Sequence, residues 1–399
     1  MSKRKSTKNL IIVIIAALLA VIAAGFMLIY MTDQREVSTE SSAENTQVDS
    51  DEAQPLATLF FASDYQEQSF ENSPADNLKE ILSAAKDAGK TVETVIICGD
   101  YTNDEKLHDY QLSPDASINE IKNVIKNVCP QVKENDEIFV QGNHDRMSDL
   151  ISESGLHEFD DFLVYVVNTQ ENFPWKQGVT RHAKEKIEKT SSDMKQCFDK
   201  LIADNEKRPV IIAGHVPLHF SGRTSSLHTT GDNMYSSLLF NEVNEAGKKL
   251  DIIYLFGHNH TKGWDCYMGG SCVYRQAGDE ILIPDCRTGG RTTDRYSAER
   301  LNFTYMNAGY IGHYMNCSPD EVTAGTVDKY AVSDCALTGT VCEIYGDKIV
   351  LTRYSKDGEH PLGGEGCHNP YRDDSSIIDA EHYSHGTAGA VSIERGLLR

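Results

Sequence analysis

The sequence has few basic residues for its number of acidic ones. Its 399 residues include 38 Lys and Arg against 60 Asp and Glu, which gives a formal net charge of -22. Binding to nucleic acid depends on clustered Lys and Arg side chains that neutralise phosphates. A balance this acidic argues against a nucleic-acid-binding surface, and it also disfavours a protein that lies flat on anionic lipid.

The chain also lacks motifs that would indicate other chemistry. It has no Cys-x-x-Cys pair, which argues against a zinc ribbon. It has no Gly-x-Ser-x-Gly elbow of a serine hydrolase and no P-loop of a nucleotide-binding protein. No internal repeat is evident either. A function must therefore be sought in other residues.

The ten cysteines are unevenly distributed. Cys98, Cys129 and Cys197 lie alone in strand-like or helix-like segments, where we expect them to act as small buried hydrophobic residues. The other seven are concentrated later in the chain, at Cys266, Cys272, Cys286, Cys317, Cys335, Cys342 and Cys367. In an exported chain this clustering predicts some disulfides in loops, although seven cysteines cannot all pair with one another.

An apolar run of 22 residues at 10–31 contains no charged side chain. As a helix it would be roughly 33 Å long, enough to cross the core of a bilayer. Most of the flanking basic residues precede it, since the five nearby are Lys3, Arg4, Lys5, Lys8 and Arg35. The positive-inside rule then predicts that residues 1–9 are cytoplasmic and that the rest of the chain is extracytoplasmic.

The alternative to a transmembrane signal anchor is a signal peptide that is cleaved, which would release a secreted protein. Cleaved signals usually have a shorter apolar core, and no clear cleavage site follows this run. We therefore expect an uncleaved anchor in the cell membrane, with most of the chain outside the cytoplasm.

The rest of the chain divides by composition. Residues 32–55 are rich in Ser, Thr, Glu and Asp, which predicts a disordered stalk. Residues 56–354 alternate between strand-like and helix-like patterns and are interrupted at 261–301 by an insertion rich in Gly and Cys. Residues 355–399 show no clear period and are predicted to form a loose C-terminal tail.

Five of the strand-like runs are apolar throughout and end in polar residues. Such strands belong to sheets that are covered on both faces, and in α/β sheets ligands bind at the carboxyl ends of the strands. The residues that end the five runs are Asp64, Asp100, Asn143-His144-Asp145, His215, and His258 with His260. Carboxylate, amide and imidazole groups suit Mn, Fe, Zn or Mg ions. The number of these groups exceeds what one tetrahedral ion takes, which favours two ions that share a carboxylate.

In chain order, these residues form five motifs: Ser63-Asp64-x-Gln66, Gly99-Asp100, Gly142-Asn143-His144-Asp145, Gly214-His215 and Gly257-His258-Asn259-His260. The series resembles the calcineurin-like metallophosphoesterase superfamily over roughly residues 56–354. The resemblance implies an α/β fold, the αββα sandwich of two mixed sheets flanked by helices. Here that fold would be preceded by one N-terminal transmembrane helix.

The resemblance also implies a role for each site residue. Asp100 would bridge two divalent metal ions. The other ligands would be Asn143, His215 and His258 for one ion, and Asp64, Gln66 and His260 for the second. His144 would lie near the leaving-group oxygen as general acid or charge stabiliser, with Asp145 orienting it.

The first motif departs from the family pattern. Asp-x-His is usual there, whereas this chain has Asp64-Tyr65-Gln66. A glutamine oxygen is a weaker ligand that favours hard ions, so we expect the second ion to be bound more loosely or to be Mn²⁺- or Mg²⁺-like. Tyr65 points to the opposite face of the strand end and is expected to pack in the core.

The resulting hypothesis is a metal-dependent phosphoesterase that hydrolyses phosphomonoesters or phosphodiesters through a hydroxide that bridges the two ions. Its substrate would be a phosphorylated small molecule or an envelope component. Loop residues that are candidates for substrate contacts are Arg223, His228, Arg287 and Arg291. The rival hypothesis is a catalytically weak or inactive cell-surface binding protein with the same fold. Gln66 motivates that alternative, and the full set of later histidines argues against it.

Overall fold

Two mixed β-sheets form the centre of the fold in a computed structural model. The structure describes residues 54–66, 73–102, 114–172, 181–218, 237–258, 274–284, 296–312, 337–360, 362 and 390–396. All belong to one compact unit, Ala53–Arg399. Within these ranges no helix is long and apolar enough to cross a membrane. The predicted anchor at 10–31 and nearly all of the predicted stalk at 32–55 lie outside the described residues.

The first sheet is seven-stranded, in the order β14-β13-β12-β1-β2-β3, with β15 also paired to β13. Strands β1, β2 and β3 are parallel, and the remaining pairs are antiparallel. The strands are β1 (Ala57–Ala62), β2 (Thr94–Ile97), β3 (Glu137–Phe139), β12 (Gly339–Ile344), β13 (Lys348–Ser355), β14 (Gly358–His360) and β15 (Ala390–Glu394).

The second sheet is six-stranded, in the order β4-β5-β6-β7-β11-β8. Its four central strands are parallel, and an antiparallel strand lies at each edge. The strands are β4 (Gly155–Glu158), β5 (Leu163–Val167), β6 (Val210–Gly214), β7 (Ile252–Phe256), β8 (Tyr274–Arg275) and β11 (Thr304–Asn307). A separate antiparallel pair consists of β9 (Glu280–Pro284) and β10 (Tyr296–Arg300).

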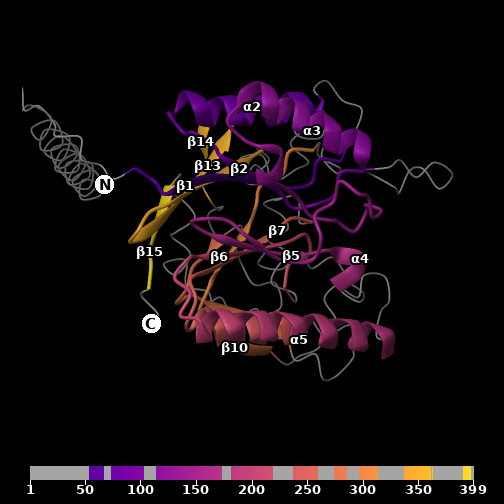
Figure 1. Cartoon of the computed structure of the whole chain (residues 1–399), viewed down its shortest axis with the longest axis vertical. Coiled ribbons are helices and arrows are strands. Elements are labelled where there is room, and N and C mark those ends of the chain that lie inside the picture. The colour runs from indigo at the N-terminus through magenta and orange to yellow at the C-terminus, as the bar shows by residue number, and fades with distance from the viewer. Residues whose placement is uncertain are drawn as a thin grey trace, which may run out of the picture. The chain divides into compact units, whose positions relative to one another are not determined.

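Helices cover the outer faces of both sheets, as Figure 1 shows with α2 and α3 at the top and α5 at the bottom. The long helices are α2 (Pro74–Asp87), α3 (Asp115–Val128), α5 (Arg181–Ala203) and α6 (Ser237–Gly247). Two short ones are η2 (Glu134–Asp136) and α4 (Thr169–Asn172). Helix α2 begins where the sequence favours it, because the Ser73 hydroxyl accepts a hydrogen bond from the N–H of Asp76 and Pro74 opens the first turn.

The alternation of side chains along β1 shows how the layers are joined. Leu59 and Phe61 face the second sheet and pack in a core between the two sheets, which includes Val164 and Ile211. Phe60 faces the other way, into a core shared with α2 and α3. A third core lies between the second sheet and helices α5 and α6. Three buried apolar cores therefore hold four layers together, which confirms the predicted αββα sandwich of two mixed sheets.

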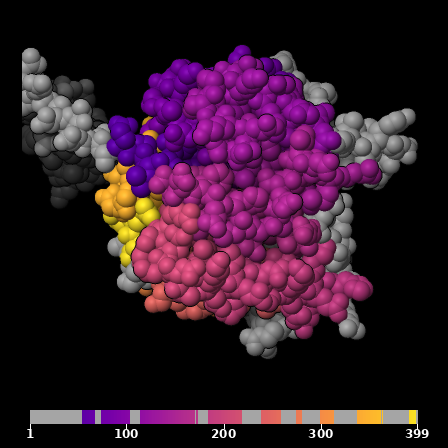
Figure 2. Space-filling model, in the orientation of Figure 1, coloured from indigo at the N-terminus to yellow at the C-terminus, as the bar shows by residue number. Residues whose placement is uncertain are grey.

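The C-terminal region differs from the prediction of a loose tail. Within 355–399 the structure describes two strands, β14 and β15, and both pair with β13. Val391 and Ile393 of β15 pack against the inter-sheet core. Only these two large apolar side chains mark the strand, so its alternation is too short to stand out in the sequence. In Figure 2 the yellow C-terminal residues lie at the surface beside the orange region that contains β13.

Candidate metal centre

The turns that follow β1, β2 and β7 share an uncommon backbone conformation. Asp64, Asp100 and His258 have φ values of 54°, 58° and 66°, in the left-handed region that non-glycine residues rarely adopt. This conformation costs roughly 1–2 kcal/mol per residue. Such strain persists when the surrounding contacts impose it, and it is concentrated at functional sites. All three residues are ones that the sequence predicts to bind metal.

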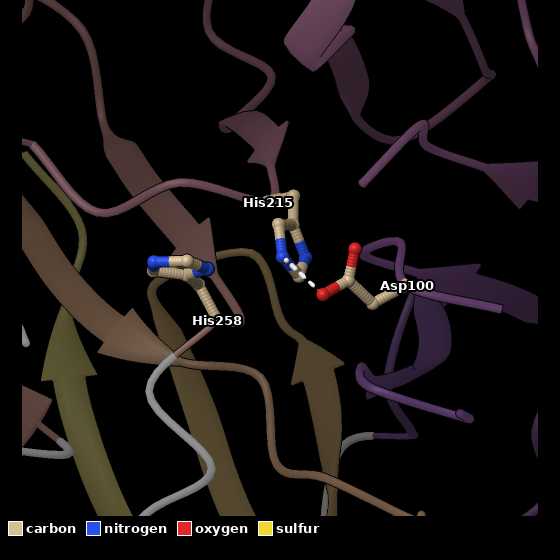
Figure 3. Close-up of side chains that lie close together, drawn as sticks. All are labelled: Asp100, His215 and His258. Atoms are coloured by element: carbon tan, nitrogen blue, oxygen red, sulfur yellow. Dashed lines mark ion pairs between the residues drawn. The ribbon is translucent and has the colours of Figure 1, made fainter. Parts of the chain in front are cut away.

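Four predicted ligands of one ion lie together. Asp100, His215 and His258 each offer a ligand atom, and these atoms lie within 4.8 Å of one another. Figure 3 shows the three side chains directed toward a common point. The Asn143 Oδ1 atom completes the group, at 2.9 Å from His215 Nε2 and 2.8 Å from His258 Nδ1. All four residues are buried. Carboxylate, amide oxygen and two imidazoles form a donor set that fits a divalent transition metal.

The orientation of the His215 ring suits metal binding. Its Nδ1 lies 2.6 Å from the carbonyl oxygen of Cys98, which also accepts a hydrogen bond of 2.9 Å from the Ser63 hydroxyl. A carbonyl can only accept, so Nδ1 carries the proton and donates it. Nε2 is then directed toward Asp100 Oδ2, 3.0 Å away. Histidine ligands of metals commonly donate their second ring N–H to a backbone carbonyl in this way.

The charges of Asp100 and His215 are coupled. Burial raises the pKa of Asp100, but the imidazoles of His215 and His144 outweigh burial and hold that pKa far below its usual range. Burial lowers the pKa of His215, but the Asp100 carboxylate outweighs it and raises that pKa to about 9. A cation that binds His215 Nε2 must displace its proton. Binding of a metal at this centre would therefore be accompanied by proton release.

The predicted ligands of the second ion are only partly described. Both carboxylate oxygens of Asp64 accept hydrogen bonds from the backbone N–H of His258, at 3.1 and 3.0 Å. The side-chain amide of Gln66 lies against Asp100, with Nε2 at 2.9 Å from Oδ2. Within the described residues Gln66 Oε1 is buried without a hydrogen-bond partner. Turning the amide by 180° exchanges its two ends, so the oxygen can reach a cation shared with Asp100. His260 lies outside the described residues.

His144 lies at the edge of the centre. Its Nε2 is 4.0 Å from Asp100 Oδ2, and 12% of its side chain is exposed. Two contacts fix its backbone, because its N–H donates to Asp100 Oδ1 at 2.9 Å and its carbonyl accepts from the Thr102 hydroxyl at 3.1 Å. The imidazole is therefore close to the predicted ligands and accessible to a substrate.

Asp145 binds backbone groups that the resemblance does not indicate. Its carboxylate accepts hydrogen bonds from four backbone N–H groups, those of Asp100, Tyr101, Thr102 and Gly142. Burial and the neighbouring Asp100 carboxylate raise the pKa of Asp145 to about 7, while the backbone donors act in the opposite direction. The sequence could not indicate these contacts, because every amino acid type except proline offers the same N–H group.

Glycines allow the strand ends to approach one another. A Cβ atom at Gly142 would overlap the Asp100 carboxylate and backbone N, and one at Gly257 would overlap the Ser63 hydroxyl. These two glycines directly precede Asn143 and His258. Glycine is needed there because a neighbouring loop occupies the space of a side chain.

The remaining sequence predictions concern Tyr65, which the structure describes, and the candidate substrate contacts, which it does not. Tyr65 is buried in the core with α2 and α3, as expected, and its hydroxyl donates to Glu120 Oε2. The candidate substrate contacts all lie outside the described residues, namely Arg223, His228, Arg287 and Arg291. Sequence reasoning missed the supporting contacts of Ser63, Thr102 and the Cys98 carbonyl. Of these, only Ser63, next to a predicted ligand, gave any signal.

Comparison with known proteins gives one sequence match. The calcineurin-like phosphoesterase family matches residues 58–262. A search of curated proteins found no match. Solved structures that match this chain include a dimetal phosphatase from Danio rerio, with a TM-score of 0.44 and 11% identity over 76% of this chain and 97% of that one. Another is a purple acid phosphatase from yellow lupin (Lupinus luteus), with a TM-score of 0.46 and 11% identity over 86% and 54%. The family match includes every motif from Asp64 to His260.

Proposed function

The chain belongs to the calcineurin-like phosphoesterase family and is a phosphoester hydrolase, and we propose that it hydrolyses phosphomonoesters or phosphodiesters at a two-metal centre outside the cytoplasmic membrane. One observation carries the proposal. Asp100, His215 and His258 come from separate strand ends in two sheets, yet their ligand atoms lie within 4.8 Å. No packing requirement explains why a carboxylate and two imidazoles are buried together, whereas a cation would stabilise the group.

The ligands divide between two positions. Asp100, Asn143, His215 and His258 would hold one ion, and Asp100 with Asp64, Gln66 and His260 the other. Two divalent ions held by these residues would lower the pKa of a bound water and would stabilise the charge that develops on the attacking and leaving oxygens of a phosphoryl transfer. The metals remain open among Mn, Fe, Zn and Mg. The oxygen ligands on the Asp64 side favour Mn²⁺ or Mg²⁺ in that position.

His144 is the residue best placed to act on the substrate. Its imidazole is close to Asp100 and partly exposed, while its backbone is fixed by Asp100 and Thr102. From Nε2 it can give a proton to the leaving-group oxygen as the ester bond breaks. A positioned acid of this kind contributes about 10²–10⁴-fold to a rate.

The proposed location rests on the sequence. The apolar run at 10–31 and the basic residues before it support a single membrane anchor with the hydrolase outside, where a phosphorylated small molecule or envelope component would be its substrate. Protease added to intact cells tests this. The hydrolase domain should be digested without detergent and should be found with the membranes. Recovery in the medium would favour the secreted alternative, and protection in intact cells would refute both.

The activity is tested with the detergent-solubilised full chain. We expect bound divalent metal by elemental analysis, and turnover of a nitrophenyl phosphate monoester or diester that increases with added Mn²⁺. If the wild-type protein binds no metal and hydrolyses neither ester with any added ion, the proposal fails. A cell-surface binding protein with this fold would then be the better interpretation.

A further inference from the structure

The carboxylate of Asp145 joins two loops through their backbones. Its side chain is fully buried. Oδ1 accepts from the N–H of Tyr101 at 2.7 Å and of Thr102 at 3.2 Å, and Oδ2 accepts from Asp100 and from Gly142, both at 2.8 Å. Three of these donors follow β2, and the fourth follows β3. One side chain thus satisfies four backbone donors at the point where the two loops meet.

The three donors after β2 are consecutive. The N–H groups of Asp100, Tyr101 and Thr102 converge on one carboxylate, and Asp100 has a left-handed φ of 58°. Successive N–H groups arranged around a left-handed residue form a concavity that binds anions. Here the anion is a side chain of the protein itself. Because the carboxylate binds this arrangement, it favours the left-handed turn over other conformations of the loop.

The contact between the loops is reciprocal. Asp100 Oδ1 accepts from the backbone N–H of His144 at 2.9 Å, while Asp145 accepts from the backbone N–H of Asp100. Each aspartate therefore binds the backbone of the other loop. This arrangement leaves Asp100 Oδ2 facing His215 Nε2 at 3.0 Å, within the cluster of predicted metal ligands.

From this geometry we propose that Asp145 is a positioning residue that holds Asp100 in its left-handed turn and so directs the Asp100 carboxylate at the metal. In this role Asp145 acts through the backbone of Asp100 rather than through His144. The inference rests on the proposed function, since it concerns the cation that Asp100 is proposed to bind.

The variant Asp145→Asn tests the role with little change in shape. Its carboxamide keeps one acceptor oxygen but turns an N–H₂ donor toward two of the four backbone donors. In the full chain we expect the affinity for Mn²⁺, measured by titration calorimetry, to fall about 10- to 100-fold, as it does when partners of metal ligands are removed. Turnover of nitrophenyl phosphate should recover as Mn²⁺ is raised. Unchanged Mn²⁺ affinity with a low kcat at saturating Mn²⁺ would overturn the proposal, because it would place the effect on His144 or the substrate.

Asn244→Ala is the matched control. Asn244 is also a buried side chain that joins backbone groups, because its Nδ2 donates to the Arg300 carbonyl at 3.0 Å and its Oδ1 accepts from the Asn302 N–H at 2.7 Å. We expect a lower melting temperature with unchanged Mn²⁺ affinity. If this variant loses Mn²⁺ affinity as much as Asp145→Asn does, the effect is one of general stability and the proposal is wrong.

A measurement on the wild-type chain covers the case in which Asp145→Asn does not fold. In protein stripped of metal, the N–H groups of Asp100, Tyr101, Thr102 and Gly142 should exchange slowly with deuterium, because Asp145 and not the metal binds them. Rapid exchange of these four groups would overturn the proposal. The result does not depend on activity, so it is separable from a failure of the proposed hydrolase function.

Discussion

The two halves of the proposed metal centre are built differently. The ligands of the first half, Asp100, Asn143, His215 and His258, follow four different strands, β2, β3, β6 and β7, in both sheets. In the second half, Asp64 and Gln66 lie two residues apart on the single turn after β1. The first half therefore exists only when both sheets are assembled. Of the second half, the structure describes Asp64 and Gln66 on one local turn and the shared Asp100, while His260 lies outside the described residues.

This difference has a consequence for binding. A cation held by the ligands of the first half would cross-link the two sheets, so it would bind the folded state only and would add its binding free energy to the stability of the fold. A cation in the second half has an amide where the family usually has an imidazole. We infer that the first ion is the tighter one and that the second exchanges more readily.

The largest effect is expected for Asp100→Asn, which removes the carboxylate that touches both halves. The metals are expected to stabilise the transition state of hydrolysis. Losing several kcal/mol of this stabilisation corresponds to a fall in kcat of about 10³-fold or more. Elemental analysis should show that both ions are lost or strongly reduced. Two retained ions and a kcat near that of the wild type would show that Asp100 does not connect the halves.

His144→Ala should separate catalysis from metal binding. We expect kcat to fall about 10²-fold or more with both ions retained, because the imidazole donates a proton and does not ligate. The loss should be smaller for a nitrophenyl ester than for an alkyl ester, since nitrophenolate leaves without protonation. Equal losses on both esters, or a loss of metal, would contradict the assignment.

Gln66→His should make the two halves of the metal centre more alike in their affinity for a metal ion. An imidazole in this position would restore the usual Asp-x-His pattern, and we expect affinity for the second ion to rise about tenfold, with the first ion unchanged. Titration with Mn²⁺ measures both steps. Tyr65→Phe is the matched control on the same turn, since it removes only the hydroxyl bonded to Glu120 and should leave both affinities unchanged.

The smallest effect on the centre is expected for Arg395→Ala. The guanidinium of Arg395 donates to the carbonyls of Tyr345 and Lys207 and lies 3.5 Å from Asp251 Oδ2, so it joins the β12–β13 hairpin to residues that precede β6 and β7. Its removal should cost about 1–3 kcal/mol of unfolding free energy, measured by denaturant titration. Metal affinity should not change, because the ligands lie at the opposite ends of those strands. A parallel loss of metal would show that the first half is less independent than its geometry suggests.

The sequence was most informative where a pattern repeats. Apolar runs that end in polar residues located β1, β2, β6 and β7, because strands in a sheet covered on both faces are apolar throughout. The left-handed turns at Asp64, Asp100 and His258 left no such pattern, since tertiary contacts impose them on residues that do not prefer them.

The roles of single residues were harder to predict than the positions of strands that have a repeated apolar pattern. Cys342 was grouped with the later cysteines, yet it is a free thiol buried between the sheets on β12, where alternation turns it inward. The backbone contacts of Asp145 could not be predicted either, because two loops bring these N–H groups together. When the partners of a residue are distant in the sequence and are backbone groups that almost any amino acid offers, no pattern in the neighbouring sequence reveals the contact.

Strand β15 has a practical consequence for producing the protein. It covers the edge of β13 from Lys348 to Thr352, where the buried Ile349 and Leu351 alternate with the partly buried Lys348 and Val350. A chain shortened to end at residue 362 would leave that edge without its partner. An uncovered edge of this kind is a template for strands of other molecules, so such a fragment is expected to aggregate. Attempts to isolate the hydrolase should keep the last ten residues, and an affinity tag is safer at the other end.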